Sequence, residues 1–387
     1  MRKTAVKKRG LAAVFALCPA AHVFVLLGAL AIALFFAQRH DKARMRALSA
    51  GFVQPLHRGL AEMTAKLPFS LAEWLYAFAI AGTMVYIIYE LVMLILRPER
   101  LARLYRLCVR LAALVLSIYA LFCLLWGVYY YGDDFISRSG LKQGEITVED
   151  LELVTLYFAD RLNEYAAQVP RDADGFCRSD RGEVMARSPR LFREAERIYP
   201  CLEGSELPAK GMFFSRVMSL IDFTGFFCPF TAEANVNTDF PEALFAATAA
   251  HELSHQRGVA KEQEANFVAV LASLLSGDPD YGYSACLLAY IHLGNALVSV
   301  DPAACRLIRA GLCDGVLADL RASSEYWDRF ETPVRNVTDA VYEGFLQSCG
   351  QTLGMRSYGA CVDLLVNCYA DAARSRFGLS EAPAEAQ

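Results

Sequence analysis

The sequence predicts a mainly helical α+β protein in which three N-terminal transmembrane helices precede a globular domain. Three observations predict this architecture. The chain of 387 residues is 55% hydrophobic, and its mean hydropathy of +0.27 is high for a soluble protein. Its first third contains three long apolar segments. Most of the remainder shows helical periodicity, with one short strand-like stretch.

The membrane anchor is predicted over residues 1–131, with transmembrane helices at about 11–37, 71–96 and 111–131. Each segment reaches the ~20 residues that a helix needs to cross a bilayer. The first segment is longer than the apolar core of a signal peptide, which has about 7–15 residues. We therefore interpret it as an uncleaved anchor.

The loops predict the orientation of this anchor. Residues 1–10 and the loop at 97–110 are densely basic, and such loops stay in the cytoplasm. The loop at 38–70 also carries basic residues, but it is longer and its charge is less dense. Three crossings from a cytoplasmic N-terminus place the chain after about Gly132 outside the cytoplasm. The expected location is a plasma membrane, with the domain extracytoplasmic.

The region that follows the predicted anchor in the sequence divides into three parts. Residues 132–146 are polar and Gly-rich and suit a linker, residues 147–378 form the domain, and the Ala- and Glu-rich tail at 379–387 is predicted to be disordered. The first helix of the domain begins at Thr147, where T-V-E-D resembles a capping box. Residues 170–190 are predicted to form a loop, and a short helix follows them.

Two strands are predicted between residues 211 and 237, the second of them an edge strand at 231–237. Asp239 and Pro241 then begin a helix that Gly258 ends. The remaining helices are predicted at about 261–275, 281–299, 303–330, 333–351 and 358–377.

Charge and cysteine content exclude some classes of function. The formal net charge of −4 leaves no excess of basic residues, which argues against nucleic-acid binding. The twelve cysteines include no C-x-x-C pair, so neither a thiolate zinc site nor a redox pair is indicated. The cysteines of the domain are either buried free thiols or, outside the cytoplasm, members of one or two disulfides.

The stretch H-E-L-S-H at 251–255 carries the chemistry. His251 and His255 lie one turn apart on one helix face and can bind one ion, and zinc in hydrolases takes three protein ligands. Glu252 points about 100° around the helix, where it can act as general base on water that zinc activates. The chain has only six histidines, so chance gives this spacing in roughly one such chain in a hundred. The alternative is a helix with two hydrogen-bonded histidines.

A third ligand is required, and the residues alone leave Glu262 and Glu264 open, both at the start of the next helix. Glu262 and Asn266 share a helix face, whereas Glu264 points about 200° away from Glu262. The run E-Q-E-A-N resembles the second motif of gluzincin metallopeptidases, E-x-x-x-[DN]. This resemblance implies Glu262 as the third zinc ligand and Asn266 as the residue that orients a histidine ligand.

A second resemblance, to a family of membrane proteins, covers most of the chain. The runs P-F-T-A-E-A-N-V-N at 229–237, A-A-H-E-L-S-H-Q-R-G at 249–258 and S-Y-G at 357–359 resemble a family of bacterial three-span membrane proteins of unknown function that is related to zincins. The resemblance implies a zincin-like domain that binds one Zn²⁺ ion. It does not imply a substrate.

Zincins also suggest where a substrate would bind. In them a strand before the metal helix pairs with an extended peptide, so the analogy places residues 231–237 along a cleft. Glu233, Asn235 and Asn237 would then contact the substrate. The alternative is that they form a polar strand face or turn.

A donor for the oxyanion that forms on the attacked carbonyl is also needed. The candidates are Tyr358, Tyr342 and Arg335, each of which can equally be structural. His292 lies in an apolar helical stretch and is predicted to be a core residue.

These features predict a membrane-anchored zinc metallopeptidase that hydrolyses peptide bonds, with Glu252 as base and then as proton donor to the leaving amine. The expected partners are the membrane and a peptide or protein substrate, cell-wall stem peptides included, and no nucleic acid. The alternative is a catalytically silent membrane sensor or scaffold whose zincin-like domain binds a ligand. The intact Glu252 argues against it, because binding alone needs no base.

Overall fold

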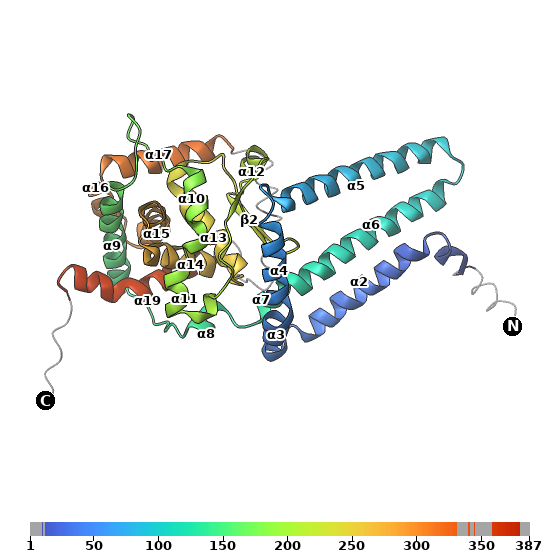
Figure 1. The fold of residues 1–387 in the computed structure, drawn as a ribbon, viewed down its shortest axis with the longest axis horizontal. Helices are drawn as coiled ribbons and strands as arrows, with labels where there is room; N and C mark the ends of the chain where they lie inside the picture. Colours follow the sequence, from blue (N-terminus) through green and yellow to red (C-terminus); the bar gives the residue numbers. More distant parts are fainter. Residues whose placement is uncertain (1–9, 11, 331–339, 341–343, 345–357, 380–387) are drawn as a thin grey trace. The chain divides into compact units, whose positions relative to one another are not determined.

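The computed structural model describes the chain except for residues 1–9, 11, 331–339, 341–343, 345–357 and 380–387 (Figure 1). The chain divides into two compact units. The first comprises Met1–Pro55 and Leu71–Gly132, and the second comprises Leu56–Ser70 and Asp133–Gln387. The helix predicted at 333–351 falls largely outside the described residues, as does the tail.

The first unit contains the predicted apolar helices α2 (Pro19–Gln38) and α5 (Leu71–Leu96), and a third helical run that begins with α6 (Arg100–Phe122). By length and composition each could cross a membrane. α5 has the predicted bounds. α6 begins at Arg100 rather than near residue 111, because the basic stretch between α5 and the apolar run is itself helical. The run continues through η2 (Cys123–Gly127) and α7 (Val128–Tyr131).

The loop between α2 and α5 is helical as well. It forms α3 (Lys42–Leu48), the π-helical turn η1 (Ser49–Val53) and α4 (Gln54–Thr64). Its second half, Leu56–Ser70, belongs to the second unit. His57 Nε2 there donates to the Pro229 carbonyl oxygen at 3.0 Å. Part of the loop is thus built into the domain, which the sequence did not predict.

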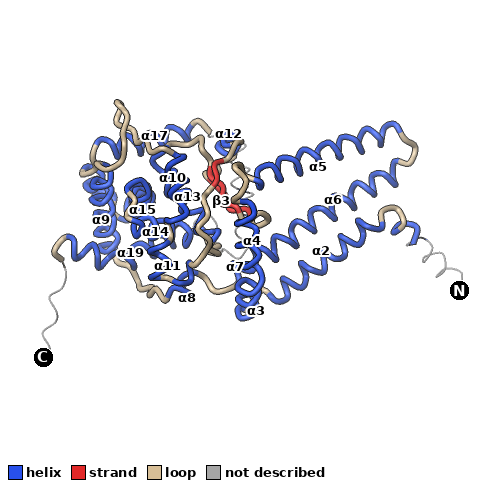
Figure 2. Tube along the Cα trace, viewed as in Figure 1, coloured by secondary structure: helices blue, strands red, loops and turns tan. Residues whose placement is uncertain are grey.

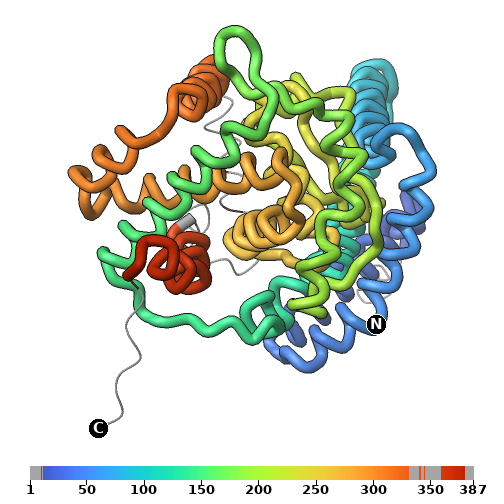
Figure 3. Tube along the Cα trace, turned by 60° about the vertical axis from the view of Figure 1, so that its left-hand side comes forward, coloured from blue at the N-terminus to red at the C-terminus, as the bar shows by residue number. Residues whose placement is uncertain are grey.

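The core of the second unit is helical. Its central helix α15 (Pro279–Val300) packs against α9 (Val148–Ala166), α13 (Phe245–Gln256), α14 (Glu262–Ser276) and α19 (Tyr358–Arg376). Figures 1 and 3 show α19 beside α9, so the C-terminal helix returns to the first helix of the predicted domain.

α15 is also long and apolar enough to cross a membrane, but its Tyr281, Tyr283 and Leu287 are buried in this core. Their burial makes α15 a core helix of the second unit. The other α-helices that the structure describes after Asp133 are α8 (Phe135–Ser139), α10 (Arg181–Arg187), α11 (Arg193–Ile198), α12 (Ser215–Leu220), α16 (Pro302–Ala310) and α17 (Asp314–Asp328).

Several predicted helix ends are confirmed. Thr147 Oγ1 accepts a hydrogen bond from Asp150 N at 3.1 Å and caps α9. α13 ends just before Gly258, which has φ 77°, and α14 ends at Gly277, which has φ 69°. Glycine adopts this left-handed conformation without the strain that a Cβ would bring.

The sheet is small (Figure 2). It consists of β1 (Lys210–Gly211), β2 (Gly225–Cys228) and β3 (Glu233–Val236) in the order β1-β3-β2. The prediction that the second strand lies at an edge was wrong. β3 is central, because β2 pairs antiparallel with one side of it and the two-residue β1 pairs parallel with the other. The apolar stretch before β2 contains the helix α12 rather than more strand.

Two segments that were predicted to be irregular contain helices. The expected linker at 132–146 contains α8, whose Phe135 is fully buried in the core of the second unit. The domain therefore begins directly behind α7, and not at residue 147. The expected loop at 170–190 contains α10. The described cysteines of the second unit are all free thiols, so no disulfide joins them.

Candidate metal centre

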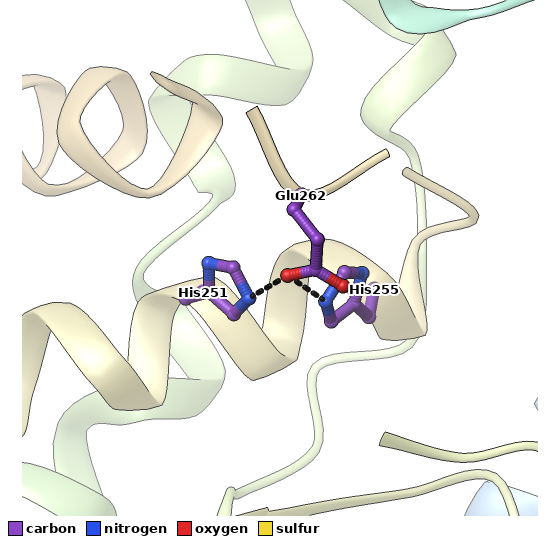
Figure 4. Close-up of side chains that lie close together, drawn as sticks. All are labelled: His251, His255 and Glu262. Atoms are coloured by element: carbon purple, nitrogen blue, oxygen red, sulfur yellow. Dashed lines mark ion pairs between the residues drawn. The ribbon is translucent and has the colours of Figure 1, made fainter. Parts of the chain in front are cut away.

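Three predicted ligands meet at one point of the second unit. His251 and His255 lie on α13, and Glu262 is the first residue of α14. One ligand atom from each lies within 4.8 Å of the others, and these residues form the one such group found in the described part of the chain. Figure 4 shows the Glu262 carboxylate lying against both imidazole rings.

The turn between the two helices creates this arrangement. Gly258 N donates to His255 O at 2.9 Å, and Val259 N donates to Ser254 O at 3.2 Å. Gly258 takes the positive φ that closes such a turn. α14 then begins at Glu262, within reach of the histidines on the preceding helix. The H-E-x-x-H and E-x-x-x-N patterns therefore face each other across a tight turn.

Hydrogen bonds fix the orientation of both rings. His251 Nδ1 donates to Asn266 Oδ1 at 2.8 Å, and His255 Nδ1 donates to Val259 O at 2.7 Å. Each Nε2 is thereby directed at Glu262. The Glu262 Oε2 lies 3.2 Å from His251 Nε2 and 3.7 Å from His255 Nε2. Rings held in this way present the nitrogen that a metal ion would bind.

The three side chains are strongly coupled electrostatically. Burial opposes protonation of His255, but the Glu262 carboxylate outweighs it and raises the pKa of His255 to about 9. Burial also opposes ionisation of Glu262, yet the neighbouring histidines lower its pKa below the usual range. The buried Glu262 carboxylate is thus stabilised by positive charge beside it. A divalent cation supplies such charge when the imidazole protons leave.

Glu252 lies beside this cluster on α13 and is only 3% exposed. Burial raises the pKa of its carboxyl to about 7, against the lowering effect of His251 and His255. Its Oε2 has no hydrogen-bond partner among the described residues. A buried carboxylate atom without a partner is costly in free energy, and groups of this kind gather at functional sites.

Gly225 packs directly against Glu252, a contact that sequence reasoning missed. A Cβ on Gly225 would lie 2.7 Å from Glu252 Oε1 and 2.8 Å from the Asn235 carbonyl oxygen. Only glycine fits at this position, the first of β2, without displacing the carboxylate or the neighbouring strand. The one sequence signal was a glycine that interrupts an apolar run.

Glu264, the alternative third ligand, is not brought to the histidines. Its Oε2 accepts a hydrogen bond from the backbone N of Phe135 at 2.9 Å. Lys261, which precedes α14, contacts Asp134 at 2.5 Å. Glu264 therefore helps to hold α8 against the start of α14, while Glu262 faces the imidazoles.

The three proposed substrate contacts lie inside the protein. Glu233 is paired with Lys210 at 2.7 Å. Asn235 and Asn237 are fully buried, and their side-chain amides donate to backbone carbonyl oxygens at 2.9–3.3 Å. In the described structure these side chains stabilise β3 and its surroundings.

The remaining candidates are placed as follows. His292 is buried in α15 as predicted, and burial together with the charge of His251 lowers its pKa to about 4. Tyr358 is the first residue of α19. Tyr342 and Arg335, the other candidate oxyanion donors, lie outside the described residues.

Comparisons with known proteins supply a family but no activity. No curated protein and no solved structure matches the chain. One family model, described as "Protein of unknown function (DUF3810)", matches residues 48–366. The match spans most of the chain, including α5, α6 and the whole candidate metal centre. The chain therefore belongs to the DUF3810 family of proteins of unknown function.

Proposed function

We propose that this protein is a membrane-anchored, zinc-dependent hydrolase of the metallopeptidase type. The observation that carries the proposal is the convergence of His251, His255 and Glu262 beside the buried Glu252. Two imidazole nitrogens and one carboxylate oxygen are the donor set of many catalytic zinc sites, and three protein ligands leave one coordination position open. The donors present therefore fit zinc.

Different residues of the site would bind the metal ion, orient its ligands and transfer the proton. His251, His255 and Glu262 would hold the ion, while Asn266 and the Val259 carbonyl oxygen keep the two rings in place. When bound, zinc lowers the pKa of water and polarises the attacked carbonyl. Glu252 accepts a proton as general base and then delivers it to the leaving amine.

The proposed substrate class is a peptide or protein, with the amide bonds of cell-wall stem peptides included. Two features favour the amide bond of a peptide over the ester bond of a small molecule as the substrate. The site resembles that of gluzincin peptidases in its motifs, and β2 adjoins Glu252 through Gly225. A strand next to a hydrolytic site offers main-chain groups along which an extended peptide can align.

We place the domain outside the cytoplasm. The segment Leu56–Ser70 lies between the first two apolar helices and belongs to the same compact unit as the domain. If α2, α5 and the α6 run each cross the membrane once, this segment and the domain share one side. The basic residues at 1–10 and 97–110 then lie on the other side, which the positive-inside rule assigns to the cytoplasm.

The test uses the full chain, purified in detergent and compared with Glu252→Gln. Zinc content is measured by mass spectrometry, and hydrolysis is measured on a fluorogenic peptide library and on stem peptides. We expect about one zinc per chain in both proteins and cleavage only by the wild type. A wild type that binds zinc but cleaves no substrate beyond those that Glu252→Gln also cleaves would favour the silent sensor. A wild type without zinc would refute the metal site.

Replacing each of the two glutamates tests the ligand assignment. Glu262→Gln should lose stoichiometric zinc, whereas Glu264→Gln should retain it, because Glu264 binds the backbone of Phe135 instead. Equal zinc content in the two variants would contradict Glu262 as the third ligand.

A further inference from the structure

The helix α12 buries both of its serines and exposes two of its three apolar side chains. Ser215 and Ser219 are buried, whereas Val217 is 53% exposed and Leu220 is 46% exposed. Phe213, just before the helix, is 77% exposed. A surface helix of a soluble domain normally buries its apolar residues and exposes its serines. In α12 both serines are buried together with Met218, while the other two apolar side chains are exposed.

The buried serines have partners, so the orientation of α12 is fixed. Ser215 Oγ donates to the Met212 carbonyl oxygen at 2.7 Å. Ser219 Oγ donates to Asp239 at 3.2 Å and accepts a hydrogen bond from Tyr326 at 2.6 Å. Turning the helix to bury Val217 and Leu220 would break these bonds. The apolar side chains are therefore held outward.

The chain around α12 lies at the end of the domain that continues into α5. Lys210, three residues before Phe213, donates through Nζ to the Phe69 carbonyl oxygen at 3.0 Å and to the Thr64 carbonyl oxygen at 2.6 Å. Two residues after Phe69, Leu71 begins the 26-residue apolar helix α5. Phe69 is therefore within about 7 Å of the start of α5 along the chain.

The same end of the domain has further residues suited to a lipid interface. Met63 is 66% exposed and Phe69 is 44% exposed. Lys66 lies between them in the sequence and is exposed. Exposed apolar side chains with neighbouring basic residues are typical of protein surfaces that rest on a membrane, with the apolar groups at the acyl boundary and the charges among the headgroups.

We propose that Met63, Phe69, Phe213, Val217 and Leu220 form a membrane-docking surface that rests in the interfacial layer of the lipid bilayer. The occupant is lipid, because the adjoining residues lead without a spacer into a helix that could span the membrane. Docking would restrict the orientation of the domain at the bilayer surface, instead of leaving the domain free to reorient about its connection to the membrane helices. The proposal rests on the membrane anchoring described above, but it does not require catalysis.

Photocrosslinking in vesicles tests the proposal. A photoreactive phenylalanine analogue replaces Val217 or Leu220 in the full chain, and the protein is reconstituted into phosphatidylcholine vesicles that contain an alkyne-tagged phosphatidylcholine. Leu307 on α16 is the matched control, because it is 77% exposed, more than either test position. Figure 1 shows α16 and α12 at opposite sides of the second unit. After irradiation, lipid adducts are counted by tag fluorescence on a gel.

We expect at least fivefold more lipid adduct at positions 217 and 220 than at position 307. Equal adduct at all three positions would overturn the docking surface, as would crosslinks from position 217 to protein in place of lipid. Flotation of the vesicles provides the second readout. A chain that floats with the vesicles but gives no adduct at 217 or 220 refutes the docking surface alone. A chain that does not float refutes the anchoring, and the docking proposal with it.

Discussion

Asn266 accepts a hydrogen bond from His251 across 2.8 Å, and this bond joins α14 to α13 at the candidate metal centre. Asn266 lies four positions after Glu262 on the same helix, so one face of α14 both orients a histidine and supplies the carboxylate beside it. The orientation of the ring and the position of the third ligand thus depend on the same helix.

The first prediction follows from this bond. Asn266→Ala should weaken zinc affinity by about 10- to 100-fold, because the His251 ring loses the partner that fixes its orientation. Asn266→Asp keeps an acceptor oxygen and should restore most of the affinity. Zinc affinity is measured by competition with a fluorescent chelator. An affinity of Asn266→Ala within twofold of the wild type would contradict a role in orienting the ring.

Gly225 gives the second prediction. In Gly225→Ala the new Cβ would meet Glu252 Oε1 at 2.7 Å and a backbone oxygen at 2.8 Å, so the carboxylate must move. A displacement of about 1 Å at the reacting groups can lower the rate 10²-fold. We expect such a loss in kcat with zinc content unchanged. The control is Gly294→Ala, where the nearest atom lies 3.9 Å away. Equal activities of the two variants would exclude this steric effect.

The local part of the site could be predicted from the sequence, because its geometry depends on helix periodicity and on one tight turn. His251, His255, Glu262 and Asn266 lie within a short stretch of chain, and the spacing of residues on helices determines which side chains share a face. The contact of Gly225 with Glu252 could not be predicted in this way. It depends on how a distant strand packs against α13.

The fold was predictable to a similar extent. Long apolar helices and helix ends follow from composition and capping, which act locally. The central position of β3 depends on β1, whose two residues carry no strand signal. The apolar composition of residues 211–230 predicted strand, but α12 lies within this stretch. Its Val217 and Leu220 are exposed while Ser215 and Ser219 are buried, a pattern that composition does not predict.

The third prediction concerns His57, which joins the loop between α2 and α5 to the domain. Burial lowers the pKa of His57 to about 4 from 6.5, although its bond to Pro229 favours protonation. The folded state therefore prefers neutral His57, and its contribution to stability is complete above about pH 6.5 and falls as the pH drops toward 4. One pKa unit corresponds to about 1.4 kcal/mol, so about 2 kcal/mol is lost by pH 5.

The measurement is denaturant unfolding of the full chain in detergent at pH 7.5 and pH 5. Glutamine is neutral at both pH values and cannot gain a proton. Its amide can still donate to the Pro229 carbonyl oxygen. His57→Gln should therefore show a pH-dependent loss about 2 kcal/mol smaller than the wild type. His292, which also has a lowered pKa, is present in both proteins and cancels. Identical pH dependence in the two proteins would show that His57 is not the group responsible.

The last prediction tests the topology with two native thiols. Cys108 lies on α6 within the basic stretch at 97–110, and Cys313 lies in the domain just before α17; both are exposed. If the domain is extracytoplasmic, a membrane-impermeant maleimide applied to intact cells should label Cys313 but not Cys108. Permeabilised cells should show labelling at both sites. Cys313→Ser and Cys108→Ser assign each signal. Labelling of Cys313 only after permeabilisation would reverse the orientation, because an impermeant reagent reaches thiols on the outer side alone.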